Sequence, residues 1–178
     1  TGLSRSGSPL ADSDALRQLP PLPGTKVELR ALAQMFPASN TSLSLESEAT
    51  EAALRQDKSL ENARILVIAT HGLLPDPALG LGEPGLVLPP PATPSDLDDG
   101  LLTATEAAQL NLSADWVILS ACNTASAENS GGNDSLSALA RAFLFAGANA
   151  LLASHWRVSD ETTAALTVET LSARQGGG

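Results

Sequence analysis

The sequences RILVIAT at residues 64–70 and WVILSA at residues 116–121 decide the fold. Both are almost continuous apolar runs rich in isoleucine and valine, the pattern of strands covered on both faces in a parallel sheet. A third run, ALLAS at residues 150–154, has the same character. Helical patterns lie between the runs, and strands that alternate with helices predict an α/β fold. We therefore expect a sandwich in which helices flank a mostly parallel sheet, with right-handed crossovers.

Size and charge exclude several classes of protein. The chain has 178 residues, enough for one full-sized domain with its own core. Twenty acidic residues oppose ten basic ones, for a net charge of −10, and a surface of this sign repels nucleic acid and anionic lipid. Tyrosine is absent and aromatic residues make up 3% of the chain, which leaves few platforms for stacking bases. We expect no nucleic-acid partner and no association with membranes.

The single cysteine, Cys122, bears on the cellular location. One cysteine cannot form an internal disulfide, and the first residues lack the order of a signal peptide. No apolar run approaches the roughly 18 residues of a membrane-spanning helix. These features predict a protein of the reducing cytoplasm. Nothing in the sequence calls for a cofactor.

The N-terminal part predicts an arm followed by a helix. Residues 1–24 are rich in serine, glycine and proline. They end in LPPLPG, which we expect to hold neither a helix nor a central strand. We interpret residues 1–24 as an N-terminal arm and residues 25–178 as the domain. Thr25 and Glu28 have the spacing of a capping box, which predicts a helix that ends near Phe36.

Further elements follow from alternation, caps and helical spacing. They are a strand at residues 43–46, a helix at residues 49–56, a helix that starts at the Thr103 and Glu106 capping box and runs to Leu110, and a helix with Asp134 as N-cap and Gly147 as C-cap. The connection at residues 72–100 is dense in proline and glycine. We expect it to lie outside the core and, because of its length, to carry function.

Candidate functional residues follow the three predicted strands. In parallel α/β sheets, ligands bind beyond the carboxyl ends of the strands. The segments in this position are THG at residues 70–72, SACNT at residues 120–124 and SHW at residues 154–156. Their reactive side chains are those of His71, Cys122 and His155.

Cys122 and His71 are residue types suited to a nucleophile and its base. A free cysteine is most often a small buried hydrophobe. A thiol, however, needs a neighbouring base or cation to ionise at neutral pH. Cys122 follows His71 by 51 positions, close to the spacing of roughly 50 found in caspases. His155 is a competing base. A zinc site formed by the three side chains is a further alternative, but it lacks the short spacings of zinc motifs.

Two other motifs indicate loops. Residues 80–85 match GxGxxG but continue into LVLPPP instead of a helix, so no phosphate cradle follows. Residues 96–100, DLDDG, are one residue short of a calcium loop and no glutamate closes them. We expect neither phosphate nor calcium there, and no metal elsewhere in the chain.

Several blocks, taken in order, resemble the CHAT domains, a bacterial family of caspase-like cysteine peptidase domains related to separase and the caspases. The blocks are LPGT at residues 22–25 with Glu28, EATEAAL at 48–54, ATHG at 69–72, DGLLT at 99–103, LSACNT at 119–124, LARAF at 139–143 with AGA at 146–148, and SHWRVSD at 154–160. ATHG and SACNT together are specific, although each alone is weak. The resemblance covers about residues 19 to 170.

The resemblance implies a caspase-like three-layer sandwich and a cysteine endopeptidase. Cys122 would be the nucleophile and His71 its base, while the backbone amides of Gly72 and Cys122 would hold the oxyanion. No residue that orients His71 can be named from the sequence. Asp160 would favour a basic residue before the cleaved bond, or it would only cap the helix that follows.

The resemblance also implies partners and missing parts. CHAT domains usually follow helical repeats, so we expect a helical-repeat region outside this chain besides a protein or peptide substrate. They also carry a strand before the point where this chain starts, and a helix and a strand after its end. We expect these flanking parts to be missing from the 178 residues. The alternative to an active peptidase is an inert or latent CHAT scaffold that binds a protein partner.

Overall fold

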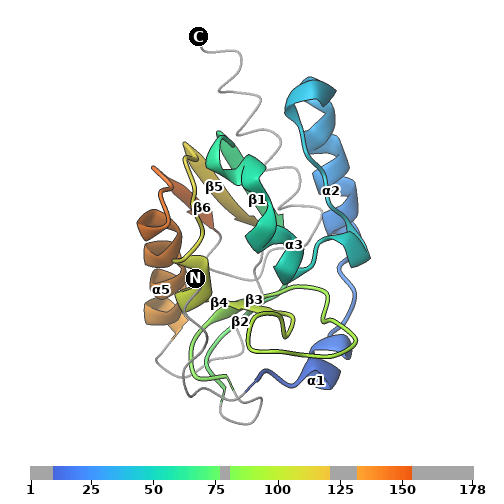
Figure 1. The fold of residues 1–178 in the computed structure, drawn as a ribbon, viewed down its shortest axis with the longest axis vertical. Helices are drawn as coiled ribbons and strands as arrows, with labels where there is room; N and C mark the ends of the chain where they lie inside the picture. The colour runs from blue at the N-terminus through green and yellow to red at the C-terminus, as the bar shows by residue number, and fades with distance from the viewer. Residues whose placement is uncertain (1–9, 77–80, 121–131, 154–178) are drawn as a thin grey trace.

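A parallel sheet of three strands forms the middle layer of the structure (Figure 1). The structure is a computed structural model that describes residues 10–76, 81–120 and 132–153. The strands are β1 (Ile65–Ala69), β5 (Trp116–Ser120) and β6 (Leu151–Ala153), in the order β1-β5-β6. Both pairings are parallel. The strands predicted from the three apolar runs are confirmed.

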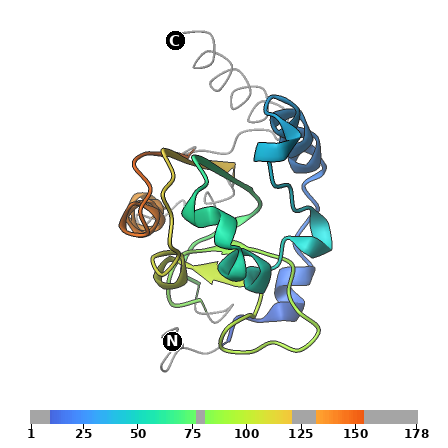
Figure 2. The same ribbon diagram turned by 45° about the horizontal axis from the view of Figure 1, so that its top comes forward.

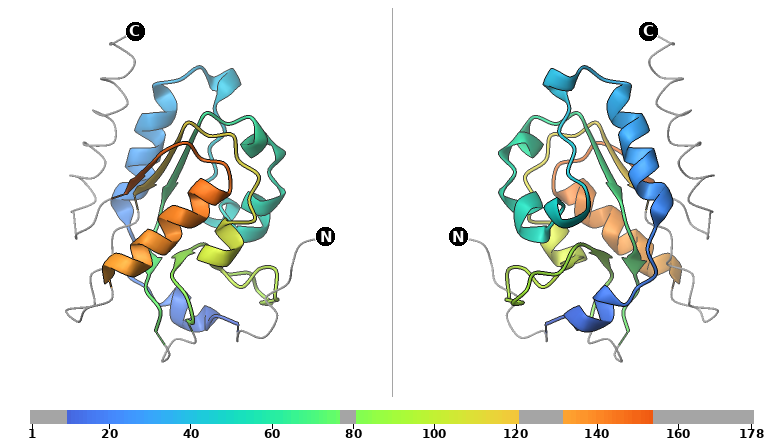
Figure 3. Two further views of the ribbon diagram at one scale, coloured as in Figure 1. Left: turned by 90° about the vertical axis from the view of Figure 1, so that its left-hand side faces the viewer. Right: turned by 90° about the vertical axis from the view of Figure 1, so that its right-hand side faces the viewer.

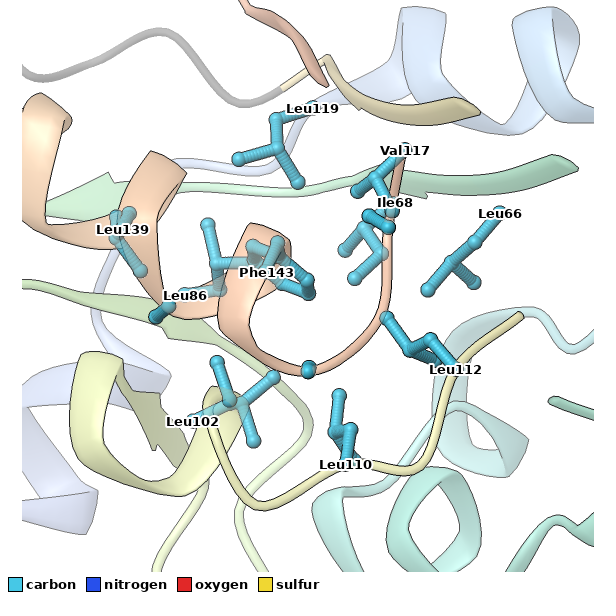
Figure 4. Close-up of a cluster of buried hydrophobic side chains, with 14 of the residues drawn as sticks. Leu66, Ile68, Leu86, Leu102, Leu110, Leu112, Val117, Leu119, Leu139 and Phe143 are labelled. Carbon is cyan, nitrogen blue, oxygen red and sulfur yellow. The ribbon is translucent and has the colours of Figure 1, made fainter. Parts of the chain in front are cut away.

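Helices cover both faces of this sheet, as Figure 2 shows for α2 (Pro23–Gln34) on one side and α5 (Gly132–Phe145) on the other. Alternate residues of the strands face alternate helices. The α5 side contains Leu66, Ile68, Val117 and Leu119 packed with Leu139 and Phe143 (Figure 4). The α2 side contains Ile65, Val67, Ile118 and Leu152 packed with Leu32 and Met35. The predicted α/β sandwich with a parallel sheet flanked by helices is thereby confirmed.

The long connection after β1 forms a second, antiparallel sheet. Its strands are β2 (Gly72–Leu73), β3 (Gly85–Val87) and β4 (Leu101–Thr103), in the order β2-β3-β4. Leu86 is 1% exposed and belongs to the same core cluster as Phe143 of α5. The expectation that the connection lies outside the core was wrong, because a three-residue strand between prolines is long enough to bury leucine and valine. Gly85 is part of this packing, since a Cβ there would lie 2.9 Å from the Leu101 side chain.

The arm contains helical structure that the sequence analysis did not predict. A short helix, α1 (Ser13–Arg17), starts after Asp12, whose carboxylate accepts the backbone N–H groups of Asp14 and Ala15. Helix α2 starts at Pro23, two residues earlier than expected. Proline fits the first helical position because no N–H partner is needed there, so the expectation that LPPLPG holds no helix was wrong for its last two residues.

The remaining helices are α3 (Glu51–Gln56), α4 (Ala104–Ala107) and the 3-10 helices Ala38–Asn40, Glu46–Glu48 and Lys58–Glu61. Helices α3 and α4 differ from expectation mainly at their ends, and the three 3-10 helices were not predicted. The capping box of Thr103 and Glu106 is confirmed, although α4 ends before the predicted Leu110. The strand predicted at residues 43–46 was wrong, because this segment pairs with neither sheet and a strand needs a neighbour for its backbone groups.

Helix α5 begins at Gly132, before the predicted cap Asp134, and its last residue is Phe145, so that Gly147, the predicted C-cap, lies one position beyond the C-cap. Gly147 has φ of 113°, a left-handed conformation. The N–H of Ala148 donates to the carbonyl of Phe143, and the N–H of Gly147 donates to the carbonyl of Leu144. These two bonds form the Schellman closure of a helix end. Within the described ranges, no helix is both long and apolar enough to cross a bilayer.

Candidate active site

The carboxyl ends of β1 and β5 lie side by side. The register pairs Ala69 with Ser120, and the N–H of Thr70 donates to the carbonyl of Ser120 over 3.2 Å. His71 lies two residues after the end of β1, and the sequence places Cys122 two residues after the end of β5. Cys122 itself, like His155 and Asp160, lies outside the described residues.

His71 is buried, with 7% of its surface exposed, and its ring is held by a main-chain carbonyl. Its Nε2 lies 2.7 Å from the carbonyl oxygen of Pro20. A carbonyl only accepts hydrogen bonds, so Nε2 carries the proton and Nδ1 of the neutral ring carries the lone pair. Nδ1 is buried and has no hydrogen-bond partner among residues 10–76, 81–120 and 132–153. The ring is thus set up to accept a proton at Nδ1.

Pro20 is the orienting residue that the sequence analysis could not name. It lies 51 residues before His71, in the LPPLPG segment interpreted as part of the arm. A backbone carbonyl has no residue-type signal, because every residue carries one. The prolines at positions 20 and 21 do restrict the backbone to extended conformations. This restriction is the one feature of the local sequence that indicates a fixed backbone conformation for the segment.

Gly72 is the first residue of β2, at an edge of the antiparallel sheet, and it pairs with Leu86. The N–H of Val87 donates to the carbonyl of His71 over 2.8 Å. In an antiparallel ladder, hydrogen-bonded pairs alternate with non-hydrogen-bonded pairs. The pair of Gly72 and Leu86 is therefore non-hydrogen-bonded, and the amide of Gly72 faces away from β3.

Glu28 of α2 is a buried carboxylate that reaches the end of β5. It is 2% exposed, and its Oε2 accepts a hydrogen bond of 2.8 Å from the hydroxyl of Ser120. The spacing of Thr25 and Glu28 predicted a capping box, but this prediction was wrong, because Leu22 is the N-cap. The spacing of Glu28 and Leu32 was the missed signal, since residues four apart share a helix face and Leu32 is in the core. Glu28 thereby fixes β5 two residues before Cys122.

Comparison with known families identifies the chain. The family model of the CHAT domain matches residues 4–178. The chain belongs to the CHAT domain family. A search of curated proteins found no match. CHAT is a caspase-like peptidase family, and the parallel sheet with its flanking helices is consistent with that fold.

A buried cluster of charged side chains connects α3, α4 and the start of β4 in this CHAT domain. Glu51 is 1% exposed and Glu106 is 4% exposed. Nη1 of Arg55 lies 3.1 Å from Glu51 Oε1 and 3.5 Å from Glu106 Oε1, so one guanidinium faces two carboxylates. Burial raises the pKa of Glu51 to about 7, and the charges of Glu106 and Asp99 add to this against the opposing effect of Arg55. The described residues contain no group of three or more His, Cys, Asp or Glu side chains that could hold a metal ion.

The raised pKa of Glu51 predicts a stability that falls with rising pH. The folded carboxyl binds its proton more tightly than the unfolded one, whose pKa is near 4.5. Its contribution is therefore complete below pH 4.5 and is lost as the pH rises to about 7, a change of about 3 kcal/mol. We expect the free energy of unfolding of Glu51→Gln to depend less on pH between 4.5 and 7 than that of the unmodified protein. The measurement is urea unfolding followed by tryptophan fluorescence.

Glu48→Gln is the matched control, because Glu48 is an exposed glutamate three residues before Glu51. It should retain the pH dependence of the unmodified protein. Equal slopes in Glu51→Gln and Glu48→Gln would show that Glu51 does not titrate in this interval.

Proposed function

We propose that this CHAT domain is a cysteine endopeptidase domain that hydrolyses peptide bonds of a protein substrate through Cys122 and His71. The hydrogen bond between Pro20 and Nε2 of His71 carries this proposal. It fixes the proton on Nε2 and leaves Nδ1 as the base. The register of β1 and β5 supports it further, because it brings the carboxyl ends of the two strands that precede these residues side by side.

Hydrolysis would proceed in two halves. Nδ1 of His71 takes the thiol proton, and the thiolate of Cys122 attacks the carbonyl carbon of the scissile bond. The imidazolium then gives this proton to the leaving amine, the C–N bond breaks and a thioester remains. In the second half, His71 takes a proton from water, the resulting oxygen nucleophile displaces the sulfur, and the proton returns to Cys122.

The oxyanion would be held by the backbone amides of Gly72 and Cys122. The orientation of Gly72 supports its part, because its N–H faces away from β3. We also propose that Asp160 lines the pocket for the residue before the cleaved bond. A carboxylate in that pocket would pair with an arginine or lysine side chain of the substrate.

The rate of Cys122 alkylation by iodoacetamide, measured against pH, tests the dyad. Cys122 is the only cysteine, so the reaction reports on this thiol alone. We expect a titration well below the free-thiol value of about 8.5. His71→Ala should move the titration toward that value and slow the reaction at pH 6.5 by about tenfold or more.

His155→Ala is the control for loss of a histidine, and it should leave the profile unchanged. A slow, free-thiol-like profile that is the same with and without His71 would contradict the dyad. That result would favour the alternative function, an inert or latent scaffold that binds a protein partner. A profile that changes in His155→Ala and not in His71→Ala would assign the base to His155.

A further inference from the structure

The chain before α2 crosses the antiparallel sheet as a strap, which we define as residues 10–22. Figure 3 shows α1 beside this sheet and the chain rising from there to α2. At its start, the N–H of Ala11 donates to Oδ2 of Asp99 over 2.8 Å. The hydroxyl of Ser13 donates to the main-chain carbonyl of Asp99 over 3.0 Å. Both bonds are buried, so water does not compete for them.

Apolar contacts hold the middle of the strap. Ala11 and Leu16 are 5% and 6% exposed. They form one cluster with Val87 of β3, Leu101 of β4 and the neighbouring Leu81. Strap and antiparallel sheet thus share a small core of their own, separate from the cluster under α5.

The end of the strap reaches the candidate base. The carbonyl of Pro20 lies 2.7 Å from Nε2 of His71, and the carbonyl of His71 accepts the N–H of Val87. Val87 pairs with Leu101, which lies two residues after Asp99. The two polar anchors of the strap are therefore joined by adjacent strands of one sheet.

Asp99 makes hydrogen bonds to the strap, to β4 and to α3. It is 2% exposed, and both carboxylate oxygens are used, Oδ2 by Ala11 and Oδ1 by the N–H of Leu101 at 3.0 Å. Its own N–H donates to Oε2 of Glu51 over 3.2 Å. A buried carboxylate that accepts two backbone N–H groups makes strong, directional bonds. Asp99 ties the strap to β4 and to α3 at once.

We propose that Asp99 is a positioning residue for His71: it holds the strap on the antiparallel sheet and thereby keeps the Pro20 carbonyl on Nε2. This inference deepens the proposed peptidase function and rests on it for its catalytic meaning. With the strap in place, the proton stays on Nε2, the base stays at Nδ1, and the imidazolium keeps an acceptor. When the strap is loosened, the ring loses that acceptor and the neutral tautomers mix.

The test is Asp99→Asn, which keeps the size of the side chain but replaces one acceptor oxygen with an amide donor. The chain has two histidines, so a His155→Ala background leaves His71 as the single histidine in a nitrogen-15 NMR spectrum. We expect the parent to show the Nε2–H tautomer and Asp99→Asn to show a mixture. In proteins that retain His155, Asp99→Asn should slow Cys122 alkylation at pH 6.5 about tenfold, the effect of about one hydrogen bond.

Asp96→Asn is the matched control, because it removes the same charge from an exposed residue of the same loop. It should change neither the tautomer nor the alkylation profile. Ser13→Ala is the milder variant to use if Asp99→Asn does not fold, and it should shift both measurements in the same direction by a smaller amount. A folded Asp99→Asn or Ser13→Ala protein with an unchanged His71 tautomer would overturn the proposal.

The two proposals fail in different ways. The tautomer measurement does not depend on Cys122, so a tautomer shift in Asp99→Asn would uphold the positioning role even if His71→Ala left alkylation unchanged. Conversely, slower alkylation in His71→Ala with an unchanged tautomer in Asp99→Asn would uphold the dyad and remove Asp99 from it.

Discussion

Replacement of Cys122 by alanine is expected to lower peptide hydrolysis by about a thousandfold or more. In the proposed mechanism the sulfur of Cys122 forms the covalent intermediate, and no other side chain of this chain is proposed to replace it. The measurement is cleavage of a peptide library by the purified protein, with the fragments identified by mass spectrometry. Fragments that disappear with the thiol would assign the chemistry to Cys122.

The folding of Cys122→Ala provides the control for this prediction. Its urea unfolding should match that of the unmodified protein, so that loss of cleavage is not loss of structure. Cleavage that persists in Cys122→Ala would contradict the mechanism. The fragments also report the residue before each cut, and cuts after arginine and lysine would support the proposed role of Asp160.

The parallel sheet could be predicted from the sequence because each of its strands is a nearly unbroken run of large apolar residues. Such a run stays recognisable without knowledge of its neighbours, since both faces are covered. Helix ends were also predictable where a local chemical device marks them. Thr103 with Glu106, and Gly147 with its left-handed backbone, are devices of this kind.

The antiparallel sheet could not be predicted in the same way. Its strands are two or three residues long, too short to show a period. Pro84 and Pro89 on either side of β3 indicate a loop by composition. The pairing that makes Gly85–Val87 a strand comes from β2 and β4, at a distance along the chain that no local pattern records.

In the candidate site, too, the features that depend on local sequence could be predicted and the contacts between distant residues could not. His71 and Gly72 could be proposed as site residues from their position after a buried strand, and this position is local information. The contacts of His71 with Pro20, and of Asp99 with Ala11, join residues 51 and 88 positions apart. In each contact one partner is a main-chain group, the carbonyl of Pro20 or the N–H of Ala11. Every residue type carries a main-chain carbonyl and almost every type an N–H, so the sequence does not indicate which residue makes the contact. The roles of Cys122 and Asp160 stay predictions.

The largest effect on stability is expected from Phe143→Ala. Phe143 is completely buried between residues of both sheets, Leu119 of the parallel sheet and Leu86 and Leu102 of the antiparallel sheet (Figure 4). Truncation to alanine removes buried apolar surface and leaves a cavity. This cavity would close only if both sheets moved toward it. We expect a loss of about 3–5 kcal/mol in the free energy of unfolding, measured by urea unfolding.

Phe145→Ala supplies the comparison, because Phe145 lies two residues further along the same helix and is 83% exposed. Both substitutions remove the same atoms from the same helix, and differences in helix propensity amount to less than about 1 kcal/mol, so a larger difference reports burial. Phe145→Ala should cost no more than about 0.5 kcal/mol. Equal costs would mean that α5 does not face the sheets through Phe143. A large cost for Phe143 alone would support the packing of this one ring against Leu119 of the parallel sheet and Leu86 and Leu102 of the antiparallel sheet, which β2 connects to His71.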